Sequence, residues 1–165
     1  AIRRQRQMCI RDSCYIDGLA FVKNGNLWMT SSEVNHAVLV LDKAGAWHRL
    51  DIEQLRGVYT INDILITSTN DKWIYVPRNT PKLVMIPNSE SLDEVSSYEF
   101  TTLIDTDGKE LTPSNYTCVA EDKDGYIWVG TNRGAVYFTK PRISSAEDKA
   151  ATRCTRVKYL SLIHI

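Results

Sequence analysis

Short runs of apolar and β-branched residues recur along the chain, and polar segments rich in Gly, Asn, Asp and Ser separate them. Several runs, such as 37–41 and 83–86, are apolar at consecutive positions, which is typical of strands covered on both faces. Asn24-Gly25 and Asp124-Gly125 indicate tight hairpin turns, because these residues accept positive φ angles at little cost. We therefore predict an all-β protein with strands at 18–23, 26–30, 37–42, 47–50, 61–67, 72–76, 82–86, 98–103, 116–120, 126–129 and 135–139.

Helical periodicity is weak throughout the chain. The segment 144–152 has a plausible N-cap and good helix formers, but it has almost no apolar face. We therefore expect a solvated loop or a single helical turn there. The segment 153–159 returns to a strand-like pattern.

Three tryptophans mark a repeat. Trp28, Trp73 and Trp128 each lie in the second strand after a polar turn, at spacings of 45 and 55 residues. A propeller blade repeats about every 40–50 residues, and we interpret the polar, acidic segment 88–96 as an insertion that lengthens the second spacing. We expect all three tryptophans in the core between blades. The predicted units are a blade at 14–57, a blade with the acidic insertion at 58–104, and the signature blade with the start of the next at 105–159.

The segment 122–134, D-K-D-G-Y-I-W-V-G-T-N-R-G, resembles the signature of two-component regulator propeller repeats, which form blades of β-propellers. The resemblance implies a partial β-propeller of about three four-stranded antiparallel blades. Because propellers have roughly four to eight blades, these form an open arc with apolar faces exposed at both ends. The middle repeat departs from the pattern, since its turn at 70–72 lacks Gly. The residues that carry the blade signature are Trp28, Trp73, Asp124, Gly125, Trp128, Gly130, Thr131 and Gly134.

The two ends of the chain differ in character from the rest. Residues 1–13 resemble a translated sequencing adapter that finishes in a transposase recognition end. Residues 160–165 are what the reverse complement of that same end encodes in frame. We therefore interpret both ends as artefacts, and we expect the natural segment to be an internal fragment of a longer, metagenomic gene.

The N-terminal segment also changes the apparent charge. The chain has 20 basic and 20 acidic residues, of which residues 1–13 contribute four arginines and one aspartate. Without them, 16 basic and 19 acidic residues remain, a net charge of −3. No basic patch interleaved with aromatic residues is left, so nucleic-acid binding is not expected. The natural segment, about 14–159, has no long apolar run, so we also expect no membrane span within it.

Cysteines and histidines do not form recognisable clusters in the sequence. Cys14, Cys118 and Cys154 lack the spacing of metal ligands, and Cys118 is expected to be a buried thiol in a strand. His36 and His48 have no Cys, His or Asp partners at ligand spacing, and we expect both to be solvated.

Two Asp-x-Asp-Gly segments, 105–108 and 122–125, superficially resemble the beginning of calcium loops. Neither is followed by a Glu at the spacing that such a loop requires, so we interpret both as hairpin turns. The sequence also lacks a Ser-His-Asp set, a catalytic carboxylate pair and a phosphate-binding glycine loop. We therefore expect a protein without catalytic activity, bound metal or cofactor.

Residues near the start of the innermost strands are candidates for contact with a ligand, because these strands line the channel of a propeller or its rim. The simpler alternative is that they only cap turns and strand ends. The candidates are Asn62, Asp63, Asn115 and Tyr116.

The resemblance also implies classes of function. Two-component regulator propeller repeats occur mainly in Bacteroidota, in the periplasmic sensing regions of hybrid two-component proteins and in a propeller protein of type IX secretion. The unit 61–79, the acidic segment 88–94 and the block 120–141 are more similar to the secretion protein. The first hypothesis is therefore a non-catalytic extracytoplasmic binding or assembly module of type IX secretion. Its partners would be other blades of the same chain and secretion-machinery proteins.

Two other hypotheses stay open. The chain could be the periplasmic propeller of a hybrid two-component sensor kinase, with an oligosaccharide as its ligand. It could also come from a propeller enzyme such as a metal-dependent lactonase or a lyase. The enzyme hypothesis requires carboxylates and His that converge in the channel, and the sequence shows no such set. The first two hypotheses place the protein in the periplasm or on the surface of a Gram-negative bacterium.

Overall fold

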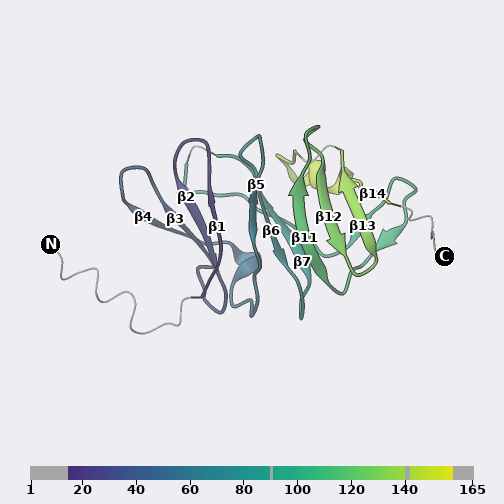
Figure 1. Ribbon diagram of the computed structural model, residues 1–165, viewed down its shortest axis with the longest axis horizontal. Coiled ribbons are helices and arrows are strands. Elements are labelled where there is room, and N and C mark those ends of the chain that lie inside the picture. Colours follow the sequence, from purple (N-terminus) through teal and green to yellow (C-terminus); the bar gives the residue numbers. More distant parts are fainter. Residues whose placement is uncertain (1–14, 90, 140–141, 158–165) are drawn as a thin grey trace, which may run out of the picture.

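The computed structural model describes residues 15–89, 91–139 and 142–157. Within them, three four-stranded antiparallel sheets stand side by side, and two further strands pair as a separate hairpin (Figure 1). The sheets form an open row and do not close on themselves, which confirms the predicted open arc of three blades. Residues 1–13 and 160–165 lie outside the described residues, so their interpretation as artefacts stays a prediction.

Each blade consists of four strands in chain order. The first blade contains β1 (Ile16–Phe21), β2 (Leu27–Ser31), β3 (Val38–Leu41) and β4 (Trp47–Leu50). The middle blade contains β5 (Ile64–Ile66), β6 (Lys72–Val76), β7 (Lys82–Ile86) and β8 (Tyr98–Phe100). The third blade contains β11 (Tyr116–Glu121), β12 (Ile127–Thr131), β13 (Gly134–Phe138) and β14 (Thr155–Arg156). The other elements are the 3-10 helix η2 (Glu53–Leu55), β9 (Leu103–Ile104), β10 (Glu110–Leu111) and α1 (Ala146–Ala151).

The first hairpin of every blade has the same register around its tryptophan. The cross-strand partners of the tryptophans are Ala20 for Trp28, Leu65 for Trp73 and Ala120 for Trp128. The first and third blades also share a bulge in the innermost strand, three residues before that partner position. The tryptophans therefore mark a true structural repeat, as their spacing predicts.

The turn that joins the first two strands also repeats in all three blades. Its fourth residue has a positive φ angle, which is 92° at Gly25, 64° at Asn70 and 79° at Gly125. In each case the N–H of this residue donates to the carbonyl three positions earlier, at 2.9–3.1 Å. Asn70 therefore takes the place of the Gly that the middle repeat lacks, because Asn tolerates the left-handed region better than most residues do.

Aspartate side chains hold three of the hairpin turns together. Oδ1 of Asp42, Asp105 and Asp122 accepts the N–H groups of the residues two and four positions further on, at 2.8–3.0 Å. In the middle blade, Thr67 Oγ1 accepts the N–H of Asp71 at 3.0 Å. The two Asp-x-Asp-Gly segments are thus hairpin turns stabilised by the bonds that Asp side chains make to their own backbone.

The C-terminal part of the chain differs from the sequence prediction in two places. β9 and β10 form a hairpin of their own, where we predicted one strand at 98–103 and a turn after it. Strands of two residues are too short to produce a recognisable hydrophobic pattern. The strand-like segment that begins at residue 153 contains β14, which pairs with β13 and completes the third blade. We expected the start of a next blade in this part of the chain.

The short helix α1 agrees with the weak helical pattern of its sequence. The hydroxyl of Ser145 caps the helix by accepting the N–H of Asp148 at 3.1 Å. None of the helical residues is buried, which follows from the lack of an apolar face.

A first hydrophobic cluster fills the interface between the first and middle blades. Trp28 from β2 is only 3% exposed, and Ile74 from β6 is fully buried in the same cluster. Lys72 Nζ lies 4.5 Å from the centroid of the Trp28 ring, which makes a cation–π contact across the two blades. Burial lowers the pKa of Lys72 to about 8, and the nearby carboxylate of Asp71 opposes this effect.

A second cluster fills the interface between the middle and third blades. Trp73 is fully buried there, and its ring stacks on Phe100 and Phe138 at centroid distances of 6.0 and 5.6 Å. Cys154 lies in the same cluster. Burial raises the pKa of its thiol to about 11, and the negative charge of Asp105 acts in the same direction.

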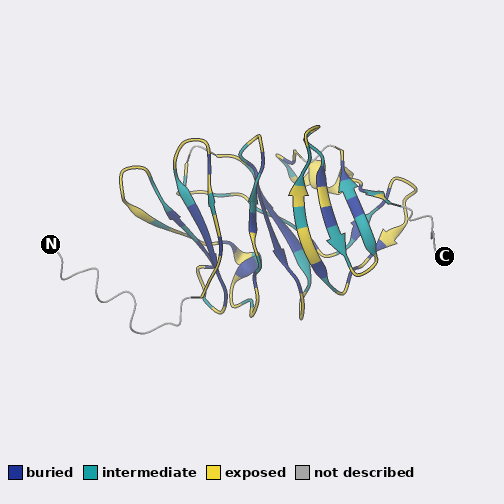
Figure 2. Ribbon diagram, in the orientation of Figure 1, coloured by how far each residue is buried: buried dark blue, intermediate teal, exposed yellow. Residues whose placement is uncertain are grey.

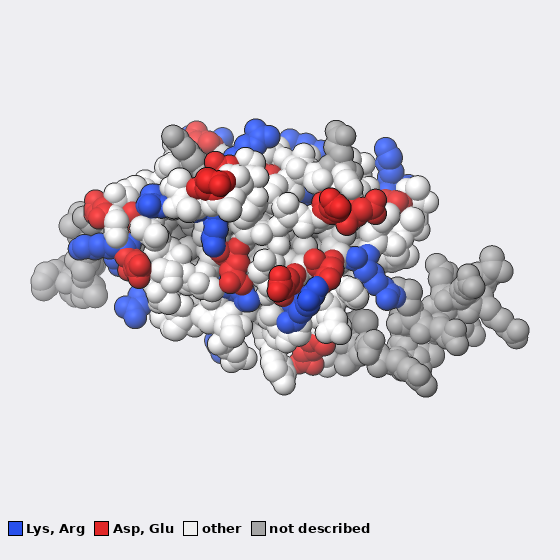
Figure 3. Space-filling view, turned by 180° about the vertical axis from the view of Figure 1, so that it is seen from behind, with Lys and Arg blue, Asp and Glu red and all other residues white. Residues whose placement is uncertain are grey.

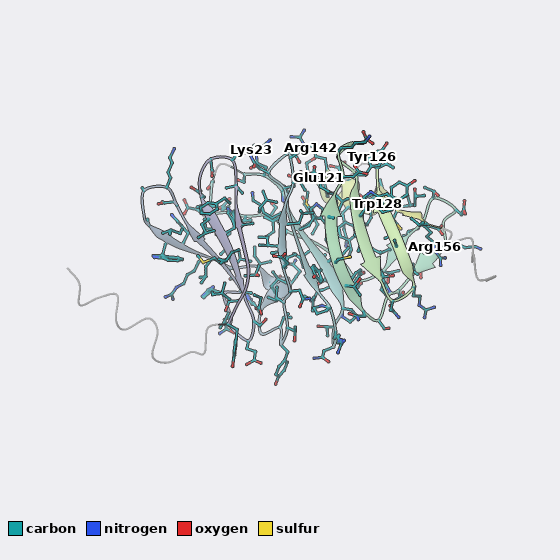
Figure 4. The ribbon with its side chains drawn as sticks, in the orientation of Figure 1. Lys23, Glu121, Tyr126, Trp128, Arg142 and Arg156 are labelled. Atoms are coloured by element: carbon teal, nitrogen blue, oxygen red, sulfur yellow. The ribbon has the colours of Figure 1, made fainter. Side chains whose placement is uncertain are left out.

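The third tryptophan corrects our prediction that all three lie in the core. Trp128 is 36% exposed, on the face of the third blade that points away from the middle blade (Figure 4). Its ring stacks on Tyr137 with centroids 4.8 Å apart, and its Nε1 donates to Asp122 at 2.7 Å. Cys118 lies on the same face and is also exposed, contrary to our expectation of a buried thiol. Both side chains are exposed because no described residue covers this face (Figure 2).

Candidate functional site

A pocket of about 390 Å³ lies where the innermost strands of the first and middle blades meet. The close approach of these strands depends on Gly18, since a Cβ atom there would lie 2.8 Å from the backbone nitrogen of Ile64. The pocket contains two of the four ligand candidates predicted from the sequence, Asn62 and Asp63. Its lining residues are Ile16, Asp17, Gly18, Leu19, Ile61, Asn62, Asp63 and Tyr75.

Asn62 connects all three blades at this pocket. Its Nδ2 donates to the hydroxyl of Tyr75 at 3.3 Å, and its backbone N–H donates to the Tyr75 carbonyl at 3.1 Å. The Tyr75 hydroxyl in turn donates to the carbonyl of Thr117 in the third blade, at 3.2 Å. From the first blade, the hydroxyl of Thr30 donates to the Asn62 carbonyl at 3.3 Å. The side chains at the pocket are therefore held in place by neighbouring blades.

Two carboxylates complete the polar part of the pocket. Asp63 Oδ1 accepts the N–H of Ile64 at 2.8 Å. Asp17 Oδ2 accepts the hydroxyl hydrogen of Ser32 at 2.6 Å, and Ser32 Oγ accepts the N–H of Ile61 at 2.8 Å. One oxygen of each carboxylate makes these bonds, and the lining contains no Lys, Arg or His. The pocket can therefore offer acceptors to hydroxyl groups, amides or amines of a partner.

Asp17 is a pocket residue that our sequence reasoning missed. The signal was present in the repeat, because Asp17, Asn62 and Thr117 each stand 11 residues before the tryptophan of their blade. This position lies next to the bulge of the innermost strand in the first and third blades. Alignment of the three repeats on their tryptophans would have identified it.

The other two sequence candidates lie outside this pocket. The backbone N–H of Asn115 donates to Asn132 Oδ1 at 3.2 Å, so Asn115 takes part in the strand-end capping that we considered as the alternative. Tyr116 is fully buried in the second hydrophobic cluster, and burial raises the pKa of its hydroxyl. Tyr116 is therefore a core residue and not the ligand contact that we predicted.

The histidines lie away from the pocket. His48, on the outermost strand of the first blade, has its Nε2 2.9 Å from Asp42 Oδ2 and is only half-buried. This contact corrects our expectation of a histidine without an acidic partner, and it lowers the pKa of Asp42. His36 is exposed, as predicted. Across the part of the chain that the structure describes, no three His, Cys, Asp or Glu side chains are placed to hold a metal ion.

The surface carries charges of both signs. Acidic and basic side chains are interspersed over the face shown in Figure 3, without a large area of either sign. Among the described residues, no helix has the length and apolar character needed to cross a membrane.

The repeated four-stranded sheets and the pocket at their innermost strands define a β-propeller segment. Residues 110–133 match the family model for the two component regulator propeller, and this match covers β10, β11 and β12. It overlaps the segment 122–134 in which we found the resemblance. No curated protein sequence matches the chain.

Several solved structures share the fold. PorZ, a bacterial surface component of the type IX secretion system of Porphyromonas gingivalis, is 17% identical with a TM-score of 0.72, over 86% of this chain and 20% of PorZ. The extracellular domain of a protein described as the hybrid two-component system BT3049 of B. thetaiotaomicron is 15% identical, with a TM-score of 0.56, over 87% of this chain and 17% of that one. Virginiamycin B lyase from Staphylococcus aureus is 15% identical, with a TM-score of 0.59, over 90% of this chain and 43% of the lyase. The chain thus spans about a fifth of the length of PorZ.

Proposed function

We propose that this chain is part of a non-catalytic propeller outside the cytoplasm, which serves as a binding or assembly module of type IX secretion in the manner of PorZ. The observation that carries the proposal is the similarity to PorZ, with a TM-score of 0.72 over 86% of this chain. PorZ is a surface component of that system, and this supports a location in the periplasm or on the cell surface.

The pocket between the first two blades is the candidate contact for a partner. Its acceptor groups are held by bonds between blades, so they are preorganised, which reduces the entropy lost on binding. Of the equivalent positions, Asp17 and Thr117 lie in the innermost strands of the first and third blades, and Asn62 lies just before the innermost strand of the middle blade. A partner that enters the channel would therefore meet a row of polar side chains.

Deletion of the gene in its host bacterium tests this proposal. We expect type IX cargo proteins to be lost from the cell surface and restored by the wild-type gene. Complementation with Asn62→Leu should restore less cargo than complementation with Lys109→Ala, which alters only an exposed turn residue. Normal cargo secretion in the deletion strain would contradict the proposal.

The second candidate is the sensing propeller of a hybrid two-component regulator. The match of residues 110–133 to the two component regulator propeller and the similarity to the BT3049 extracellular domain favour it. In this case the deletion strain would secrete its cargo normally and would lose a transcriptional response to an oligosaccharide. A histidine kinase encoded in the same reading frame would establish this alternative.

The similarity to a lyase keeps an enzyme as a third hypothesis. A propeller enzyme requires acid–base groups or a metal in the channel. The pocket contains Asp17 and Asp63, whereas His48 lies on the outermost strand of the first blade. Metal analysis of the purified full-length protein provides the test. A tightly bound stoichiometric ion would support an enzyme, and its absence together with lost cargo secretion would support the assembly module.

A further inference from the structure

The pocket at the innermost strands receives one carboxylate from each of the two blades that form it. Asp17 belongs to β1 of the first blade, and Asp63 directly precedes β5 of the middle blade. Both residues are exposed. The two blades pack on each other through the first hydrophobic cluster, so the pocket lies inside the arc and does not depend on what covers the outer blades.

Gly18 allows the two carboxylates to share one part of the pocket. A Cβ atom at Gly18 would lie 3.0 Å from Asp63 Oδ1, so the Asp63 side chain lies against the backbone of β1. The residue that precedes Gly18 in this strand is Asp17. Two negative charges at one site repel each other, and a bound cation would remove this repulsion.

The protein holds one oxygen of each carboxylate and leaves the other one available. The Ser32 hydroxyl donates to Asp17 Oδ2, and the N–H of Ile64 donates to Asp63 Oδ1. Among the described residues, none donates a hydrogen bond to Asp17 Oδ1 or to Asp63 Oδ2. The described lining also contains no Lys, Arg or His. Two fixed acceptors are therefore ready for donors from outside the chain.

We propose that this pocket binds the guanidinium group of an arginine side chain, which a partner protein inserts between the first and middle blades. A guanidinium carries five N–H donors in a planar fork and stays charged, so it can donate to both carboxylates at once. The lining also includes Ile61 and Tyr75, and the methylene groups of arginine pack well on such side chains. The inference rests on the proposed function, because an assembly module needs a partner protein that supplies the arginine.

The donor set favours a guanidinium over a metal ion. Within the described part of the chain, no three His, Cys, Asp or Glu side chains are placed to hold a metal. Calcium takes about six to eight oxygen ligands, which is far more than the two available carboxylate oxygens. Charge-assisted hydrogen bonds from a guanidinium require only one acceptor for each donor.

NMR titration of the ¹⁵N-labelled chain tests the proposal. The probe is the peptide acetyl-Gly-Gly-Arg-Gly-Gly-amide, and its control carries citrulline, which has the shape of arginine without the charge. We expect the arginine peptide to shift the signals of the Ile64 N–H and the Asn62 side-chain amide. It should bind roughly tenfold more tightly than the citrulline peptide, and added salt should weaken its binding.

Two conservative variants identify the groups that bind. Asp17→Asn and Asp63→Asn each remove one charge and keep an oxygen that accepts from Ser32 or Ile64, so both are expected to fold. Each should weaken binding of the arginine peptide roughly two- to fivefold, and the double variant should weaken it about tenfold. Asp107→Asn is the matched control, because it makes the same charge change in the exposed turn between β9 and β10. This control should bind the peptide as the wild type does.

Three results would overturn the proposal. The first is equal binding of the two peptides by the wild type, which requires no variant to fold. The second is normal binding by the double variant, with its folding checked by circular dichroism. The third is a shift of the same signals by calcium chloride alone that also prevents the peptide from binding, since the pocket would then be a metal site.

The titration and the secretion assay can fail separately, because the titration uses only the purified chain. Arginine binding together with normal cargo secretion would contradict the proposed function and support the assignment of the pocket. Lost secretion without arginine binding would support the proposed function and contradict that assignment.

Discussion

Strands β6 and β12 occupy the same place in two successive blades, yet their environments differ. All five residues of β6 are buried, whereas buried and exposed residues alternate along the first part of β12 (Figure 2). The two strands have equivalent tryptophans in equivalent register, at Trp73 and Trp128. The difference arises from the neighbours, because β6 has a blade on each side and β12 has a described blade on one side only.

The sequence of a blade determines its turns and strand register locally, whereas the burial of its side chains depends on the neighbouring blades. Hairpin turns and strand register are local, and they repeat in every blade regardless of what lies next to it. Burial depends on stacking against neighbours, because each blade must cover the apolar faces of the next. An aromatic residue at a repeat position is therefore assigned to the core only where the neighbouring blade that covers its face is present, as the middle blade covers Trp28.

The largest expected difference lies between the two tryptophans themselves. Trp73→Ala should lower the free energy of unfolding by about 3–5 kcal/mol, because it leaves a cavity in the second cluster. Trp128→Ala should cost about 1 kcal/mol or less, because its site is already open to solvent. Equilibrium denaturation with urea measures both values. Equal costs for the two substitutions would contradict the distinction between a covered and an uncovered face.

Lys72 gives a test of the covered face that depends on pH. Burial lowers its pKa to about 8 in the folded protein, and the unfolded value is about 10.4. Between these values the unfolded chain binds more protons, so the free energy of unfolding rises with pH. The Lys72→Met variant has no titrating group at this position, so its free energy of unfolding lacks this contribution to the pH dependence.

The stability advantage of Lys72→Met over the wild type should therefore shrink by about 1–2 kcal/mol between about pH 7 and 10, after allowance for solvent screening. Denaturation curves at several pH values measure the difference. Tyr116 and Cys154 also titrate at high pH, but they are present in both proteins and their effects cancel. A constant difference across this range would show that Lys72 is not buried between the blades.

The smallest expected difference lies between two substitutions at the turn of the middle blade. Asn70→Ala should cost about 1–2 kcal/mol, because alanine is strained at a positive φ angle and the bond from the Lys23 N–H is lost. Asn70→Gly loses the same exposed bond without the strain, so its cost should stay within about 0.5–1 kcal/mol. Thermal denaturation compares the two variants, and equal destabilisation by both would contradict the equivalence of Asn70 with Gly25 and Gly125.

Much of the fold could be predicted from the sequence because blades are built from local signals. The Asp-Gly and Asn-Gly turns, the apolar runs and the tryptophan spacing predicted the four strands of the first and middle blades. The pairing of β14 with β13 could not be predicted, because an intervening segment that includes α1 separates the two strands. The exposure of Trp128 depends on what covers the third blade, and no local pattern carries that information.

The candidate site was predicted only in part. Asn62 and Asp63 were chosen because they precede an innermost strand, and both line the pocket. Asp17 was missed because it was not aligned with Asn62 through the repeat. Tyr116 was misplaced because it was chosen only for its position near the start of an innermost strand, whereas its ring packs in the second cluster.

The central claim is that equivalent tryptophans differ in exposure because of neighbouring blades. NMR of the chain labelled with ¹⁵N-tryptophan reports on each indole N–H separately. With a soluble paramagnetic agent, we predict strong broadening for Trp47 and Trp128 and little for Trp28 and Trp73. Broadening of Trp73, or protection of Trp128 equal to that of Trp73, would contradict the account.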